Sequence, residues 1–140
     1  MLVDLGSGNG YPGLVIGRAR PGLRTLLVEA SVSKAGFLEQ VARTTGANAE
    51  ILARHVQRAA DLEIDEPVRV LTTRAMGNWE RVVPRLVPVL ARDAEVLIWA
   101  GADVEAIAAR GAWRKLSAQG TIPLPGRDRA RIWRFRTIRP

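Results

Sequence analysis

Short apolar runs alternate with amphipathic segments along most of the chain. The apolar runs have the length and composition of buried strands and occupy residues 2–5, 24–29, 50–53, 68–73 and 95–100. The segments between them place apolar residues at helical spacing and occupy residues 13–20, 31–45, 56–62, 79–90 and 103–110. Strands that alternate with helices of this length predict an α/β fold, in which a parallel sheet carries helices on both faces.

Several of these elements carry signals at their ends. Ser31 is suited to cap the second helix, and Gly46 is suited to end it. Pro84 and Pro88 each remove a helical N–H group. The segment 79–90 is therefore expected to kink or to break early.

The C-terminal stretch interrupts the alternation. Residues 113–138 predict two strands that turn at Pro125 and Gly126. The chain has 140 residues, and no Ser- or Gly-rich linker divides it. We therefore expect one domain, residues 1–140, with enough buried surface for a single core.

A glycine-rich turn follows the first strand in the stretch VDLGSGNGYPG, residues 3–13. Glycine lets the main chain approach a ligand closely, and the helix that follows offers free N–H donors. In a parallel sheet, a ligand lies outside the carboxyl ends of the strands, where the strand order reverses. The turn predicts a site for a nucleotide-like ligand; a turn that only packs strand against helix is the alternative.

The residues around the turn narrow the choice of ligand. Three glycines match the spacing of a dinucleotide fingerprint, and Glu29 lies near the distance of a ribose-binding acid. However, Pro12 removes an N–H donor, and the Asp4 carboxylate would repel a pyrophosphate. S-adenosylmethionine carries no phosphate, and a carboxylate attracts its sulfonium and ammonium groups, directly or through water. Asp4 and Glu29 therefore favour S-adenosylmethionine.

The charge of the chain points to a polyanionic partner such as nucleic acid. The formal net charge is +7, and the isoelectric point calculated from the sequence is about 11.3. All but two of the 21 basic residues are arginine, whose planar fork suits phosphate and base-edge contacts. A GC-rich genome, whose codons favour arginine over lysine, is the alternative explanation.

Several classes of function are disfavoured by what the sequence lacks. The chain has no cysteine, which excludes thiolate metal sites and thiol nucleophiles. His55 is the only histidine and has no partner at metal-ligand spacing, so no metal site is expected. No run approaches the ~18 apolar residues of a membrane span, and we expect a cytoplasmic protein without a membrane partner.

Further motifs extend the glycine turn. The chain carries four motifs in order: an aspartate, a glycine loop that ends in Pro-Gly, an acid at the end of the second strand, and a helix with the pattern Lys-x-x-Phe-Leu. These residues are Asp4, Gly6, Gly8, Gly10, Tyr11, Pro12, Gly13, Glu29, Lys34, Phe37 and Leu38. Together with TTRAMGNWERVVPRLVPVL and PLPGRDRARIWRF, they resemble the ribosomal RNA small subunit methyltransferase G family, also known as glucose-inhibited division protein B. The resemblance spans almost the whole chain.

The resemblance implies a class I S-adenosylmethionine-dependent methyltransferase fold. This fold is Rossmann-like, with a mostly parallel seven-stranded sheet and a C-terminal antiparallel hairpin. The implied activity is methyl transfer from S-adenosylmethionine to N7 of a guanine in small-subunit (16S) ribosomal RNA, with S-adenosylhomocysteine as product. The implied partner is that RNA or the small ribosomal subunit. A small-molecule methyltransferase and a non-catalytic cofactor-binding or RNA-binding relative are the alternatives.

The expected cofactor site combines the glycine turn with positions carried over from the family. Gly6 and Tyr11 would line the methionine and sulfonium end, and Val56 and Gln57 would contact the adenine. Arg74 would lie beside the cofactor and orient the target base, which makes it the candidate catalytic residue. The expected cofactor-binding residues are Asp4, Gly6, Ser7, Gly8, Gly10, Tyr11, Glu29, Ala30, Val56, Gln57 and Arg74.

The implied acceptor atom agrees with the residues present. Guanine N7 presents a lone pair and carries no proton, so methyl transfer needs alignment and electrostatic support rather than a general base. No obvious base is present in the motifs. Methylation at pyrimidine C5 ordinarily needs a cysteine nucleophile, which the chain lacks.

The last strand supplies the expected RNA contacts. Trp133 and Phe135 would share one face of this strand, and Arg134 and Arg136 the other. We expect this arginine face, together with Arg129, to contact RNA phosphates. A solvated sheet edge is the alternative.

Two features depart from the family pattern. The family has a helical extension before the first strand, whereas this chain begins at the strand itself. A flank of the sheet is therefore expected to be exposed and to promote self-association. A family lysine after the fifth strand is replaced, with Trp99 or Ala100 near its place, and a loss of that lysine would weaken or retarget catalysis.

Overall fold

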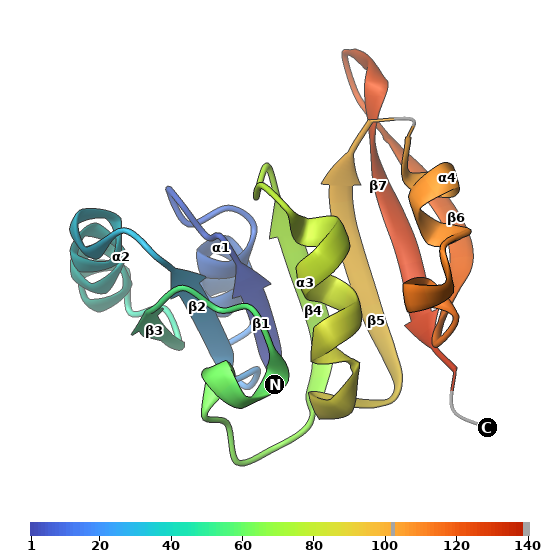
Figure 1. Ribbon diagram of the computed structural model, residues 1–140. Coiled ribbons are helices and arrows are strands. Elements are labelled where there is room, and N and C mark those ends of the chain that lie inside the picture. The colour runs from blue at the N-terminus through green and yellow to red at the C-terminus, as the bar shows by residue number, and fades with distance from the viewer. Residues whose placement is uncertain (102, 139–140) are drawn as a thin grey trace.

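A seven-stranded sheet forms the centre of the molecule, in the order β3-β2-β1-β4-β5-β7-β6 (Figure 1). The computed structural model describes residues 1–101 and 103–138, and of residues 127–129 the backbone alone. Pairs among the first five strands are parallel, and β7 runs antiparallel to β5 and β6. The strands are β1 Leu2–Leu5, β2 Thr25–Glu29, β3 Ala49–Ala53, β4 Val68–Arg74, β5 Leu90–Ala100, β6 Leu116–Leu124 and β7 Arg127–Thr137. The mostly parallel sheet with a terminal hairpin is confirmed.

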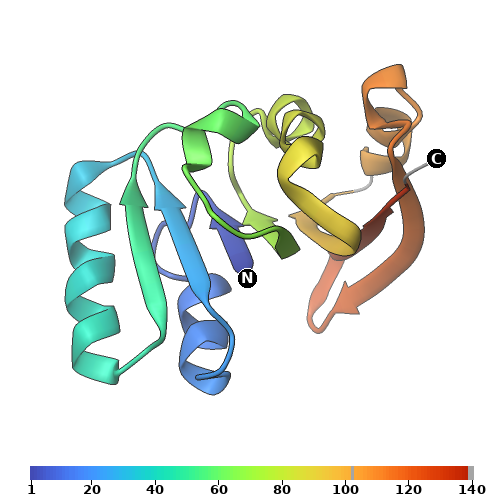
Figure 2. The ribbon, with the colours of Figure 1, turned by 90° about the horizontal axis from the view of Figure 1, so that it is seen from below.

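Helices lie on both faces of this sheet, as the sequence predicts. α1 and α2 lie on one face, and α3 and α4 lie on the other (Figure 2). The helices are α1 Gly13–Ala19, α2 Val32–Thr45, α3 Trp79–Leu86 and α4 Val104–Ala108, with 3-10 turns η1 Ala59–Leu62, η2 Val87–Val89 and η3 Gly111–Trp113. In the described ranges, no helix is long and apolar enough to cross a membrane.

Successive side chains of the central strands point to opposite faces of the sheet and form part of two apolar clusters. The larger cluster lies between the sheet and α3, where Val3 and Val83 are fully buried. The smaller cluster joins the sheet to α1 and α2 through Leu27 and Leu38. Asp4 follows Val3 in β1 and therefore lies on the side of the smaller cluster. A carboxylate thus enters an apolar layer directly below the glycine turn.

Helix boundaries mostly follow the signals in the sequence. Ser31 Oγ accepts the N–H of Lys34 at 3.4 Å at the start of α2, and Gly46 ends that helix in the left-handed region. α3 ends at Leu86, which is the early break that its prolines predict. β5 begins at Leu90 rather than at residue 95, and α4 is shorter than the expected segment 103–110.

The helix expected over residues 56–62 is wrong in type and length. Only the 3-10 turn η1 forms there. The Asp61 carboxylate accepts the N–H groups of Gln57 and Arg58, at 2.9 and 3.0 Å. This local hydrogen bonding offers the backbone an alternative to a helix, which explains the difference.

One half of the sheet has no helix on the α1 side. α1 packs on β1, β2 and β3, and no helix in the described part of the chain covers β5 and β7 on that side (Figure 2). Ile98 and Trp133 point into the larger cluster, so their neighbours in each strand point to the opposite face. These neighbours are Leu97, Trp99 and Ile132, and they are half-buried. We call this surface of β5 and β7 the open face.

Gly13 marks a close approach between α1 and the sheet, and its replacement should be costly. A Cβ atom there would lie 2.5 Å from Leu27 Cδ2 and 2.6 Å from Asp4 Cβ. We expect Gly13→Ala to lower the free energy of unfolding by about 2–3 kcal/mol, because buried atoms must move apart. Urea denaturation measures this change.

Gly36 on the exposed side of α2 provides the matched control. Nothing lies within 4 Å of a Cβ atom at this position. Gly36→Ala should raise the free energy of unfolding by about 0.5–1 kcal/mol, because alanine favours the helix. Equal effects of the two substitutions would contradict the close approach at Gly13.

Candidate functional site

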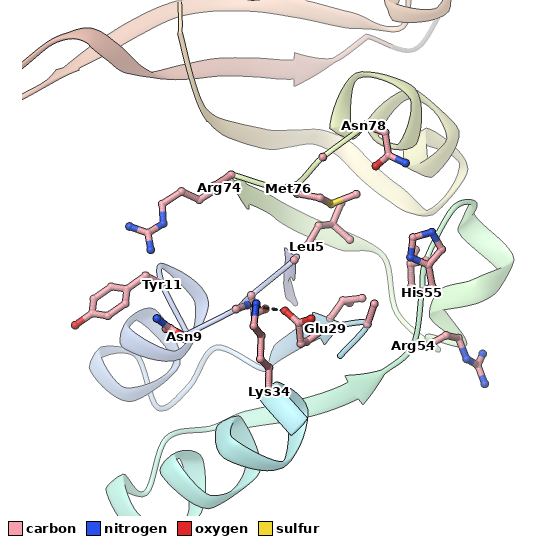
Figure 3. Close-up of a pocket in the computed structure, with 18 residues that line it drawn as sticks. Leu5, Asn9, Tyr11, Glu29, Lys34, Arg54, His55, Arg74, Met76 and Asn78 are labelled. Atoms are coloured by element: carbon pink, nitrogen blue, oxygen red, sulfur yellow. Dashed lines mark hydrogen bonds between the residues drawn. The ribbon is translucent and has the colours of Figure 1, made fainter. Parts of the chain in front are cut away.

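An open cleft of about 720 Å³ lies where the strand order reverses, between β1 and β4. Its walls come from the residues that follow β1, β2, β3 and β4 (Figure 3). This is the edge at which parallel sheets bind ligands. The glycine turn therefore lies at the position that the sequence pattern predicts.

The glycine turn is tied both to β2 and to the segment after β4. The N–H groups of Gly6 and Ser7 donate to the carbonyl oxygen of Val28, at 2.9 and 3.0 Å. Gly6 has φ +67°, and a Cβ atom there would lie 3.0 Å from Met76 Cβ. Both conformation and space therefore require glycine, and the turn lines the cleft with main chain.

Glu29 ends β2 at the floor of the cleft, with only 8% of its surface exposed. Its Oε2 accepts the N–H of Gly8 at 2.9 Å, and its Oε1 accepts the N–H of Ser31 at 2.8 Å. These two bonds fix the carboxylate in one orientation, and Figure 3 draws the bond from Gly8. Each oxygen can accept a further hydrogen bond, so the group can hold a pair of neighbouring hydroxyls.

Asp4 lies beneath the turn and is outside the cleft wall, at 1% exposure. Its Oδ2 accepts the N–H of Gly13 at 3.2 Å, and its Oδ1 accepts the hydroxyl of Thr72 at 2.6 Å. Burial raises the pKa of Asp4 above its ordinary value, although these hydrogen bonds oppose the change. In the structure Asp4 holds the turn from below and does not line the cleft, and its contact with S-adenosylmethionine, directly or through water, stays a prediction.

Arg74 and Tyr11 form one end of the cleft (Figure 3). Arg74 ends β4 and is exposed, and its guanidinium lies 5.6 Å from the centre of the Tyr11 ring. A cation over an aromatic face is attracted to it, which restrains two exposed side chains. Trp99 on β5 pairs with Arg74 on β4. The position at which the family lysine is replaced therefore lies on the open face, next to the Arg74 end of the cleft.

Most of the expected cofactor residues meet in the cleft. Those that line it are Gly6, Ser7, Gly8, Tyr11, Glu29, Ala30, Val56 and Arg74. The three that do not line it are Asp4, Gly10 and Gln57. Gln57 is exposed, and its Nε2 lies 2.8 Å from His55 Nε2.

Several residues of the cleft were not predicted from the sequence. The largest group follows β4, where Ala75 and Asn78 both have φ +55°. Left-handed non-glycine residues cost on the order of 1 kcal/mol and often mark functional segments. Lys34 extends from α2 toward the cleft, while the Arg54 guanidinium points away from it (Figure 3). The rule that ligands meet the carboxyl ends of strands could have found the segment after β4.

The expected RNA-binding arginines lie on the open face. Arg136 Nη2 lies 2.5 Å from Glu95 Oε1, and Arg134 Nη2 lies 3.5 Å from Glu95 Oε2. The hydrogen bond from Arg136 and the charge of Arg134 hold the pKa of Glu95 below its ordinary value. The side chain of Arg129 is outside the described residues. The open face therefore carries arginines that already share an acid.

Comparisons with known proteins support the resemblance. The family model described as rRNA small subunit methyltransferase G matches residues 1–122. The ribosomal RNA small subunit methyltransferase G of Sorangium cellulosum is 34% identical over 113 residues, which cover 80% of this chain and 47% of that protein. The protein of the same name from Bradyrhizobium sp. (strain BTAi1) is 37% identical over 109 residues, which cover 74% and 48%. The chain spans about half the length of these curated relatives.

A solved structure shows the same fold. The RNA methyltransferase from Salinibacter ruber, in complex with S-adenosyl-L-homocysteine, superposes with a TM-score of 0.72. The match covers 97% of this chain and 79% of that chain, at 18% sequence identity. The expected methyltransferase fold is thereby confirmed.

The buried carboxylate of Asp4 should make stability depend on pH. Its native pKa is raised, so the native state holds the proton to a higher pH than the unfolded chain does. Stability therefore falls as the pH rises from the unfolded pKa through the native pKa. Asparagine at position 4 does not titrate, so the unfolding free energy of Asp4→Asn should rise relative to that of the wild type as the pH increases across this window. Urea denaturation between about pH 4 and about pH 8 measures the gap.

Asp4→Ala is the second variant in this test. It removes the acceptor of the Gly13 N–H and the Thr72 hydroxyl, which should cost about 2–4 kcal/mol at the low end of that pH range. Because alanine does not titrate either, this cost should decrease as the pH rises. A constant gap between Asp4→Asn and the wild type would show that the Asp4 pKa is not raised by folding.

Proposed function

The chain belongs to the rRNA small subunit methyltransferase G family, and we propose that it transfers a methyl group from S-adenosylmethionine to N7 of a guanine in small-subunit (16S) ribosomal RNA. The observation that carries the proposal is the orientation of Glu29 at the strand reversal. Its carboxylate lies in a cleft whose glycine turn is supported from below by a second carboxylate, Asp4. A nucleoside ligand without phosphate fits this arrangement.

The residues of the cleft fit S-adenosylmethionine. The volume of about 720 Å³ lies in the range of cofactor sites. Glu29 would hold the two ribose hydroxyls, and Val56 would supply an apolar wall for the adenine. The turn at Gly6 and Gly8 would pass close to the ligand because it carries no side chains there. A pyrophosphate would instead meet negative charge on both sides of the turn.

Methyl transfer to guanine N7 asks for alignment and electrostatic support. When bound, S-adenosylmethionine supplies an electrophilic methyl group, and N7 presents a lone pair without a proton. Arg74 would orient the guanine, because its donors reach from the end of β4 over the outer end of the cleft. Tyr11 would restrain Arg74 from one side. No general base is required in this scheme.

The proposal includes a partner and a location. Residues 1–140 would act as one methyltransferase domain, with ribosomal RNA or the small ribosomal subunit as substrate. Such a substrate would place the protein in the cytoplasm, where bacterial ribosomes are assembled. Arg134 and Arg136 on the open face, with Arg129, are further candidates for RNA contact.

Arg74→Ala tests the assignment of the target-base end. We expect methyl transfer to small-subunit RNA to fall on the order of 10–100-fold, because the base loses an orienting contact. S-adenosylhomocysteine binding should change far less, since Glu29 and the glycine turn remain. Transfer of a radiolabelled methyl group, followed by mass spectrometry of the modified guanine, measures the effect.

Arg43→Ala on the exposed end of α2 is the control for the lost charge. It should leave methyl transfer near the wild-type rate. Full activity in Arg74→Ala would remove Arg74 from the mechanism. Tight S-adenosylhomocysteine binding without any RNA methylation by the wild type would favour a small-molecule or a non-catalytic relative.

Self-association through the open face is a separate expectation. Leu97, Trp99 and Ile132 form an apolar row there without a covering helix in the described ranges. Gel filtration should show a species larger than the monomer, and Trp99→Ser should shift it toward the monomer. A sharp monomer peak for the unaltered chain would contradict this expectation.

A further inference from the structure

A basic groove lies on the face of the molecule opposite the open face. It has a volume of about 410 Å³ and runs between the C-terminal end of α3, the turn η2 and the segment around η3. Its charged side chains are Arg85, Arg114 and Lys115, and all three are exposed. Among the described residues that line it, none is acidic. We call this surface the basic groove.

The cations of the basic groove lack the partners found on the open face. There, two arginines share the Glu95 carboxylate. Among the side chains that the structure describes, no ion pair joins Arg85, Arg114 or Lys115 to an acid. Three like charges around one groove repel one another, and a bound anion would relieve that repulsion. The groove is therefore better prepared for a phosphate chain than the open face is.

One side of α3 connects the cleft to the basic groove. Asn78 lines the cleft and precedes α3, and Arg81 and Arg85 follow at spacings of three and four residues. These spacings place all three on one helix face. α3 runs from the carboxyl edge of the sheet down its front (Figure 1). A rise of about 1.5 Å per residue puts Arg85 about 10 Å from Asn78, or about three stacked nucleotides.

We propose that the basic groove binds backbone phosphates of single-stranded RNA a few nucleotides from the target base. The assignment rests on the proposed function, which brings an RNA base to the cleft. Arg81 continues the positive charge from the groove toward the cleft along α3. The remaining lining is backbone, proline and small apolar side chains, so the contacts are to phosphate and carry no base preference.

The test compares two triple variants with the same loss of charge. The groove variant combines Arg85→Gln, Arg114→Gln and Lys115→Gln. The control variant combines Arg18→Gln on α1, Arg20→Gln directly after α1 and Arg43→Gln on α2. These three residues are exposed and have no ion pair among the described side chains. The probe is a fluorescein-labelled single-stranded RNA of about 20 nucleotides, with anisotropy recorded over a range of salt concentrations.

We expect the groove variant to bind the RNA more weakly and with a shallower salt dependence. The slope of log K against log salt should decrease by about 2, because each lost phosphate contact on a single strand removes about 0.7. The control variant should stay near the wild-type slope. Equal changes of slope in both variants would show that only the net charge matters, and would overturn the assignment. A groove variant that binds RNA with the wild-type affinity and slope would overturn it as well. So would a wild type that does not bind the RNA.

Calorimetry with S-adenosylhomocysteine separates this inference from the proposed function. Both triple variants should bind it as the wild type does, because neither alters the cleft. If none of the proteins binds S-adenosylhomocysteine, the proposed function fails. The comparison of the RNA slopes then still shows whether the basic groove binds phosphates. If all bind it and the slopes agree, the groove assignment fails and the proposed function stands.

Discussion

The buried Asp4 carboxylate joins the three elements that form the cleft. It lies in β1, accepts the N–H of Gly13 at the start of α1, and accepts the Thr72 hydroxyl from β4. These contacts span the point where the strand order reverses. A buried charge is expensive unless its lone pairs are used, so both partners must stay in place. Together with the bonds from Gly6 and Ser7 to Val28, this group sets the position of the glycine turn and of the floor of the cleft.

Charge is arranged differently in the cleft and on the surface. Inside, two carboxylates support the turn and the proposed ribose site, and this arrangement favours a ligand without phosphate. Outside, the arginines are numerous, and they divide into paired and unpaired sets. Arg24, for example, binds Glu50, Asp65 and Glu66, which fastens the amino edge of the sheet. A basic surface around this cleft suits the proposed methyl transfer to a base within a polyanion.

The sequence predicted the parts of the fold that local signals control. The apolar alternation located the central strands, and Ser31, Gly46 and the prolines of α3 set helix ends because caps and missing donors act within a few residues. The position of Asp4 below the turn could not be predicted from the sequence, because it depends on the pairing of β1 with Thr72, far along the chain. The pairing of Arg134 and Arg136 with Glu95 was missed for the same reason, since it depends on the register between β5 and β7. The segment after β4 could be predicted from the rule that ligands meet the carboxyl ends of parallel strands.

The proposed function requires that the cleft binds a methyl donor rather than a dinucleotide. Isothermal titration of the wild type with S-adenosylhomocysteine and, separately, with NAD tests it most directly. We expect binding of S-adenosylhomocysteine in the micromolar range and no detectable heat with NAD. Binding of NAD, or of neither ligand by a folded sample, would contradict it.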